Sequence, residues 1–198
     1  MEKLDEKIAA LERVQRMEQR ENSEKGKEDD RLLLSVEEIR QGIRKESFLL
    51  PGKGELSFKT AVCFEEKIPL IFPDEFYTDR QETEDAIILV NNEKKVGQTL
   101  IHLQVDMEKL GMDAWEEQIK QGMKANGFYV DIIKKVQLGA LDYIAYRIPS
   151  KDGWIYNIMC RIHKTDWRVI GGGNCMDEDR DTYGRMLEAV LMEMAQRL

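Results

Sequence analysis

The chain has 198 residues, of which 42% are apolar, and its formal net charge at pH 7 is −8. This length and apolar content suffice for one hydrophobic core of ordinary size. Nucleic acids and anionic membrane surfaces attract clustered Lys and Arg, so the acidic charge and the lack of a basic cluster argue against both as the main partner.

The first residues, MEKLDEKIAALERVQRMEQREN, are charged throughout and lack the apolar core of a signal peptide. No segment approaches the roughly 20 apolar residues of a membrane span, so no membrane insertion is expected. Cys63, Cys160 and Cys175 are an odd number and lie in apolar, strand-like runs. This arrangement favours buried thiols over a disulfide framework, and we expect a cytoplasmic protein.

An amphipathic helix is predicted at residues 1–21. Its apolar residues recur at spacings of four and three, at Leu4, Ile8, Leu11 and Val14. A coiled coil normally sustains this pattern over three or four heptads, whereas this stripe stops early. We therefore expect the stripe to be an interaction surface that docks on its own domain or on one partner helix, with a monomer favoured over a homodimer.

A polar linker containing glycine is predicted at residues 22–30, with a second helix after it. Ser35 and Glu38 have the spacing of a capping box at the start of this helix. The helix is expected to continue to the double breaker PGKGE. We therefore expect a helical extension over residues 1–50 and a separate domain over residues 51–198.

The first part of this domain has the pattern of strands. ELSFKTAVCF is followed by KIPLIFP, where Pro69 and Pro73 restrict the second run to an edge strand or an irregular one. AIILV and GQTLIHLQV flank the polar NNEKK, which predicts a hairpin.

A helix follows in the segment DAWEEQIKQGMKANG. Asp113 can cap its start, and Gly127 can adopt the left-handed conformation that ends a helix. Trp115, Ile119 and Met123 share one helical face and are expected to be buried.

Four apolar runs come next and are separated by short breaks at Gly139, residues 149–153 and residues 163–166. Loops of this length join antiparallel neighbours, whereas parallel strands need long crossovers. A final helix is predicted at residues 178–196. The expected fold is α+β, a mainly antiparallel sheet of about six or seven strands flanked by helices as an α/β/α sandwich.

This order of elements, together with the apolar-Pro-Asp segment from Leu70 to Phe76, resembles the Mog/PsbP-like α/β/α sandwich superfamily over residues 56–198. That superfamily includes the extrinsic photosystem II protein, the nuclear Ran-binding Mog protein, bacterial DcrB-type proteins and the Eag chaperones of type VI secretion. Its known members are mostly non-enzymatic binding proteins. The resemblance therefore implies a binding role, and it does not extend to the first 55 residues.

The stretch GGGNCMDEDRDTYG superficially resembles two ligand loops. Its glycines lack the Gly-Lys-Ser/Thr context of a phosphate loop, so we expect them to let a helix approach a covered strand or to permit a bulge. Four acidic residues fall at positions 1, 3, 5 and 12 of a calcium loop, but Thr182 replaces the glycine required at position 6. These four are Asp177, Asp179, Asp181 and Glu188.

Cys160, His163 and Cys175 do not complete a four-ligand zinc set, and neither histidine has a Ser or Cys beside it in sequence. We therefore expect no bound metal, no cofactor and no catalytic constellation.

Two hypotheses about function remain. The first is an intracellular, non-catalytic protein-binding module or chaperone-like adaptor of unknown partner, for example a secreted effector. It would use the N-terminal stripe and the sheet face that the helices leave open, because exposed apolar surface often marks an interaction site. The second is a small-molecule-binding or enzymatic domain with an aromatic pocket. Its lining would be Tyr143, Tyr146, Trp154, Tyr156, Trp167 and His102.

Overall fold

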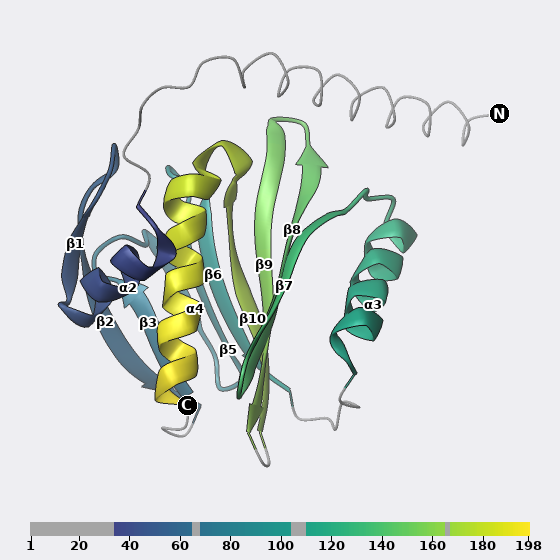
Figure 1. Ribbon diagram of the computed structural model, residues 1–198, viewed down its shortest axis with the longest axis horizontal. Coiled ribbons are helices and arrows are strands. Elements are labelled where there is room, and N and C mark those ends of the chain that lie inside the picture. Colours follow the sequence, from purple (N-terminus) through teal and green to yellow (C-terminus); the bar gives the residue numbers. More distant parts are fainter. Residues whose placement is uncertain (1–33, 65–67, 104–109, 165–166) are drawn as a thin grey trace. The chain divides into compact units, whose positions relative to one another are not determined.

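Figure 1 shows a computed structural model of the protein, which describes residues 34–64, 68–103, 110–164 and 167–198. The chain divides into residues 1–32 and residues 33–198, and all described residues belong to the second unit. The stripe at Leu4, Ile8, Leu11 and Val14 and the linker at 22–30 lie outside the described residues. None of the described helices is long and apolar enough to cross a membrane.

The described helices are α2 (Val36–Arg44), α3 (Met112–Ala125) and α4 (Arg185–Arg197). The strands are β1 (Ser47–Leu50), β2 (Gly54–Cys63), β3 (Ile68–Pro73), β4 (Asp79–Glu82), β5 (Ala86–Asn91), β6 (Val96–His102), β7 (Asp131–Leu138), β8 (Leu141–Ser150), β9 (Gly153–Lys164) and β10 (Trp167–Met176). A 3₁₀ turn (Asp177–Asp179) and a π turn (Arg180–Gly184) precede α4.

The strands form two sheets. The larger has seven strands in the order β4-β5-β6-β10-β9-β8-β7, and the smaller has three in the order β1-β2-β3. Every strand pair in both sheets is antiparallel. The prediction of an α+β fold with a mainly antiparallel sheet is therefore confirmed. Strand β3, with its two prolines, lies at an edge of the small sheet, as predicted.

The two faces of the large sheet are covered by different helices (Figure 1). Successive side chains of a strand point to opposite faces. On β8, Tyr143 packs into the core that contains α4, whereas Ile144 packs into a second cluster with Trp115 of α3. The helix stripe that we expected to be buried in α4 is 0–3% exposed, at Met186, Leu187, Val190 and Leu191.

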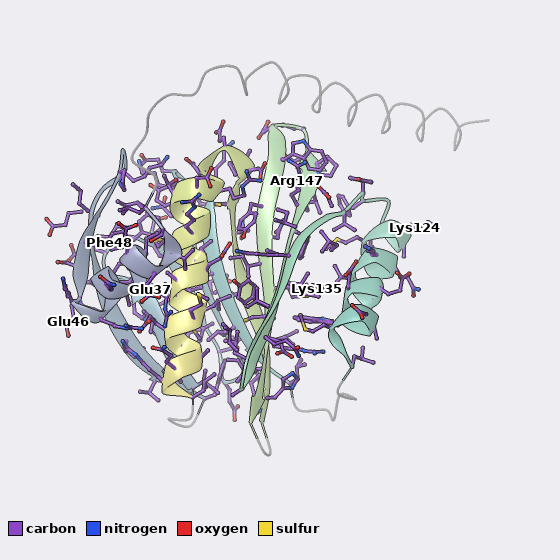
Figure 2. The ribbon with its side chains drawn as sticks, in the orientation of Figure 1. Glu37, Glu46, Phe48, Lys124, Lys135 and Arg147 are labelled. Atoms are coloured by element: carbon purple, nitrogen blue, oxygen red, sulfur yellow. The ribbon has the colours of Figure 1, made fainter. Side chains whose placement is uncertain are left out.

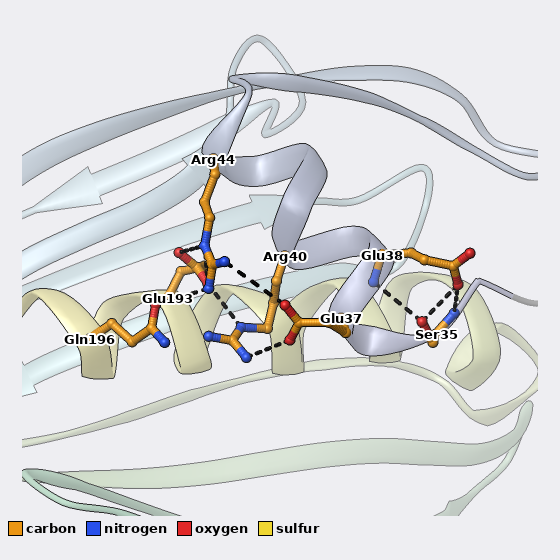
Figure 3. Close-up of polar contacts among 7 residues, drawn as sticks. All are labelled: Ser35, Glu37, Glu38, Arg40, Arg44, Glu193 and Gln196. Atoms are coloured by element: carbon orange, nitrogen blue, oxygen red, sulfur yellow. Dashed lines mark hydrogen bonds and ion pairs between the residues drawn. The ribbon is translucent and has the colours of Figure 1, made fainter.

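Helix α2 lies against α4 (Figure 3). The capping box that Ser35 and Glu38 predict is present at its start. Ile39 and Ile43 belong to the same core cluster as α4. The sequence-based boundary at residue 50 is therefore wrong in the structure, because α2 and β1 are part of the main unit, which begins near residue 33.

The second helix is also shorter than expected. It ends at Arg44, Glu46 has a left-handed φ of 65°, and residues 47–50 form β1 instead of continuing the helix. Phe48 of β1 stacks on Phe58 of β2, with ring centroids 5.6 Å apart. This packing and the pairing with β2 stabilise a strand where the sequence alone suggested helix.

Two further elements differ from expectation. Strand β4 was not predicted, because all four of its residues are polar and exposed, and it is held by backbone pairing with β5. The last helix begins at Arg185, not at residue 178. The π turn before it brings Tyr183 into the core, where its ring lies 5.5 Å from that of Phe76.

Helix α3 matches its prediction to within one residue at each end. Gly127 follows it with a left-handed φ of 78°. Asp113 lies in the first turn, after the N-cap at Gly111, and its carboxylate pairs with Lys135 of β7 at 2.6 Å. Figure 2 shows Lys135 on the strand that faces α3.

Candidate functional site on the open face of the large sheet

The antiparallel register defines a continuous surface on strands β5, β6 and β10. Directly paired residues lie on the same face of a sheet. The pairs form three rows: Ala86, Ile101 and Ile170; Ile88, Thr99 and Gly172; and Val90, Gly97 and Asn174. Gly172 also pairs with Met159, which in turn pairs with Ile144, so these rows lie on the same side as α3.

Helix α3 covers only part of this side. Its packing partners in the sheet come from β7, β8 and β9, among them Ile132, Tyr146 and Met159. Of the helices that the structure describes, none packs on the three rows of β5, β6 and β10. Every residue of these rows except Gly97 is partly or fully exposed. We call this surface the open face and define it as Ala86, Ile88, Val90, Thr99, Ile101, Ile170, Gly172 and Asn174.

The centre of the open face is hollowed. A depression of about 240 Å³ is lined by residues that include Thr99, Ile101, Ile170 and Met159. Gly172 lies in its floor, and a Cβ atom there would be 1.7 Å from the carbonyl oxygen of Ile158. Only glycine therefore fits this backbone.

A second depression of about 480 Å³ lies at the hairpin end of the same strands. It is lined by the β5–β6 turn, the β8–β9 turn and the end of β10. Its charged lining residues are Lys95, Lys151 and Asp152. Asn174 lines both depressions, so they adjoin along β10, and we refer to them together with the open face as the groove.

The groove has the dimensions of one helix. Three strands spaced about 4.8 Å apart give a width of about 14 Å, and a helix with its side chains is about 10–12 Å wide. The seven residues of β6 extend about 24 Å, and a helix of the 14 residues found in α3 is about 21 Å long. The uncovered part of the sheet can therefore accommodate one further helix beside α3.

A polar cluster lies on the opposite face, beneath α4. The side chain of Glu188 is 6% exposed and accepts hydrogen bonds from the hydroxyl groups of Tyr156 and Tyr143, the latter at 3.4 Å. Lys134 of β7 also pairs with this carboxylate. Burial, reinforced by the adjacent carboxylate, raises the pKa of both tyrosines, so the hydroxyl groups remain donors. The Glu188 carboxylate is buried in this cluster, which fixes α4 on the sheet.

A second buried pair positions α3. The Arg161 guanidinium donates to the Asp142 carboxylate at 2.9 Å and lies 4.4 Å from the ring centre of Trp115. Asp142 and Arg161 are 4% and 9% exposed, so this is a buried ion pair in which each charge neutralises the other. The pair holds α3 over β8 and β9, next to the open face.

The aromatic residues of the second hypothesis do not line one pocket. Tyr143 and Tyr156 lie with Glu188 in the filled core, whereas Tyr146 points to the α3 side. Trp154 is 6% exposed and its ring packs under Arg147, 4.6 Å from the guanidinium carbon. Figure 2 labels Arg147 near the end of this hairpin.

His102 and Trp167, the other two residues proposed to line the aromatic pocket, do not complete it. His102 lies at the end of β6, with its Nδ1 3.6 Å from the carboxylate of Asp85 and its ring 5.8 Å from that of Phe64. Trp167 begins β10, and its side chain lies outside the described parts of the chain.

The glycine run lies inside β10, paired on both sides. A Cβ atom at Gly173 would be 2.8 Å from Leu187, so the expected close approach of a helix is confirmed. The acidic residues that follow pair with cations: Asp177 with Arg147, Asp179 with Lys53, and Asp181 with Arg185. Within the described ranges, no group of His, Cys, Asp or Glu is arranged to hold a metal ion.

The sequence predicted an uncovered sheet face but not which residues form it. Ile88 and Val90, two residues apart, carried a weak signal, because alternate positions share a face. The strand order, which places β10 between β6 and β9, was needed to bring Ile170, Gly172 and Asn174 beside them.

No family model and no curated protein sequence matches the chain. Among solved structures, that of CyanoP, the cyanobacterial PsbP from Synechocystis sp. PCC 6803, is similar with a TM-score of 0.53. The match covers 70% of this chain and 92% of CyanoP at 11% sequence identity. At this identity the similarity concerns the fold alone. The protein therefore has a PsbP-like α+β fold.

Proposed function

We propose that the protein is a non-catalytic binding module, or chaperone-like adaptor, whose groove binds an amphipathic helix of a protein partner. The observation that carries the proposal is the open face: apolar side chains of β5, β6 and β10 form an uncovered surface about as wide and long as one helix, with a depression at its centre. Exposed, contiguous apolar surface on a folded protein commonly marks a binding site for another protein.

A helix suits the groove better than an extended peptide does. An added strand pairs with a sheet edge, whereas the groove lies over β6 and β10, both of which already have strand partners on each side. The neighbouring part of this side is itself occupied by a helix, since Trp115 and Ile119 of α3 pack on Ile144 and Tyr146. A second helix would extend the same layer.

The sequence resemblance to bacterial DcrB-type proteins and Eag chaperones agrees with this role, because an Eag-like protein would bind apolar helices of a secreted effector. We further propose that the protein acts as a monomer in the cytoplasm. The alternative of an aromatic small-molecule pocket gains no support, because Tyr143 and Tyr156 fill the core and Tyr146 lies on the other face.

The proposal can be tested with a stapled model peptide as long as α3, with leucines at helical spacing and an uncharged polar face. Binding to the full-length protein would be measured by fluorescence anisotropy. Ile88→Lys should weaken binding about tenfold, since burying one such side chain contributes about 1.5–3 kcal/mol.

Val62→Lys is the matched control, because Val62 is 58% exposed and lies on the small sheet, outside the groove. It should leave the affinity unchanged, and circular dichroism would verify that both variants fold. If the peptide does not bind saturably, or if the two variants weaken binding equally, the proposed function is wrong.

A further inference from the structure

We infer that the partner helix lies in the groove with its carboxyl end at Lys95 and Lys151, and that it carries acidic residues in its last turn. This orientation rests on the proposed function and goes beyond it, because an apolar groove alone would accept a helix in either direction. The evidence is the distribution of charge between the two ends of the groove.

The hairpin end of the groove is positive. Its charged lining residues are two lysines and one aspartate, in a chain whose net charge is −8. Lys95 pairs with Asp152 at 3.5 Å, and both of these side chains are about half exposed. Lys151 is exposed and forms no ion pair with any described residue. Among the described residues, one positive charge at this end therefore has no carboxylate partner.

Among the described side chains, the other end of the open face carries one exposed carboxylate. Ala86 begins β5 there, directly after Glu84 and Asp85. Glu84 is exposed and, two residues before Ala86, shares its face. Asp85 instead pairs with His102 at 3.6 Å on the opposite face, where His102 lies beside Val169 and Phe64. The described side chains thus place two lysines at one end of the open face and the Glu84 carboxylate at the other.

A helix has the matching asymmetry. Its aligned peptide dipoles give a negative partial charge at the carboxyl end and a positive one at the amino end. A helix whose carboxyl end lies near Lys95 and Lys151 therefore meets favourable charge at both ends, and the reverse orientation meets unfavourable charge at both. Acidic side chains in the last turn would pair with the lysines and strengthen the preference.

The test uses two stapled peptides with the same leucine stripe. One carries two glutamates in its last turn, and the other carries them in its first turn. In low salt, where surface charges are least screened, the full-length protein should bind the first peptide about fivefold more tightly. Lys151→Glu should remove this difference.

Lys45→Glu is the control with the same charge change, because Lys45 is exposed at the end of α2, outside the groove. It should retain the fivefold preference. A nitroxide spin label on the carboxyl end of the first peptide should broaden the amide signals of Lys95 and Lys151 more than those of Glu84 and Asp85.

The outcomes separate the two proposals. If both peptides bind the wild type equally, or if the label broadens the Glu84 end more, the orientation is wrong while the groove still binds helices. If neither peptide binds saturably, the proposed function fails and the orientation fails with it.

Discussion

Replacing Glu193 by Gln should destabilise the protein, because this carboxylate connects α4 to α2 (Figure 3). Its side chain is 3% exposed and accepts hydrogen bonds from Arg40 Nε and Arg44 Nη2, each at 2.8 Å. Breaking a fully buried pair costs about 3–5 kcal/mol, whereas an exposed pair contributes less than about 1 kcal/mol. Arg40 and Arg44 are 13% and 42% exposed, so we expect an intermediate loss of about 2 kcal/mol in the free energy of unfolding.

Thermal unfolding followed by circular dichroism would measure this loss as a decrease in Tm of about 4–8 °C for a protein of this size. Glu37→Gln is the control: Glu37 pairs with the same Arg40 at 2.7 Å but is 53% exposed, and its removal should lower Tm by at most about 2–4 °C. Equal decreases for the two variants would refute the argument that burial sets the contribution of this pair.

The effect of Glu193 should depend on pH. Burial alone would raise the pKa of this carboxyl, but the hydrogen bonds from Arg44 and Arg40 outweigh it and hold the pKa below its usual value of 4.5. A carboxyl whose pKa is lower in the folded state contributes full stability above its unfolded pKa and loses it as the pH falls through the folded pKa. The difference between wild type and Glu193→Gln should therefore be constant near pH 7 and shrink below about pH 4.5.

Three further predictions concern packing, thiols and the second polar cluster. Gly172→Ala should not fold, because its Cβ would lie 1.7 Å from the Ile158 carbonyl oxygen. Gly122→Ala, on an open part of α3, should instead raise the free energy of unfolding by about 0.5–1 kcal/mol. Urea unfolding would test both variants, and a stable Gly172→Ala would contradict the local geometry. Burial raises the pKa of Cys160 to about 12. A thiol reagent at pH 8 should therefore leave Cys160 unmodified in the native protein and modify it in guanidinium. Rapid modification of the native protein would show that this part of the strand is not buried. Trp115→Leu should weaken the packing of α3 by removing the ring under Arg161. Amide hydrogen exchange should then accelerate in α3 and stay unchanged in α4. Equal acceleration in both helices would contradict the separation of the two core clusters.

The parts of the fold that sequence predicted well depend on local signals. The Ser35–Glu38 capping box, the hairpin between β5 and β6 and the end of α3 at Gly127 each follow from a few neighbouring residues. Buried positions in α4 followed from helical spacing alone.

The parts that sequence missed depend on partners far along the chain. Residues 47–50 became β1 because Phe48 meets Phe58 and because the segment pairs with β2. Strand β4 carries no apolar pattern at all and exists through its backbone pairing with β5. Propensity cannot indicate either contact, since both are tertiary.

The candidate site was predictable only in outline. The sequence indicated an antiparallel sheet with a face left open, but the aromatic residues that drew attention on β8 and β9 belong to two different faces. The open face consists of residues that form no recognisable motif in the sequence, such as Ile88, Thr99 and Gly172. They become one surface only through the strand order and register.

The measurement that tests the central proposal most directly is an amide chemical-shift titration of the isotopically labelled full-length protein with the stapled leucine peptide. Saturable binding should shift amides of β5, β6 and β10 around Ile88, Thr99 and Gly172, and should leave those of the small sheet unchanged. Shifts confined to another apolar surface, such as the exposed Phe128 and Tyr129, or no saturable shift at all, would contradict the assignment of the open face as a helix-binding groove.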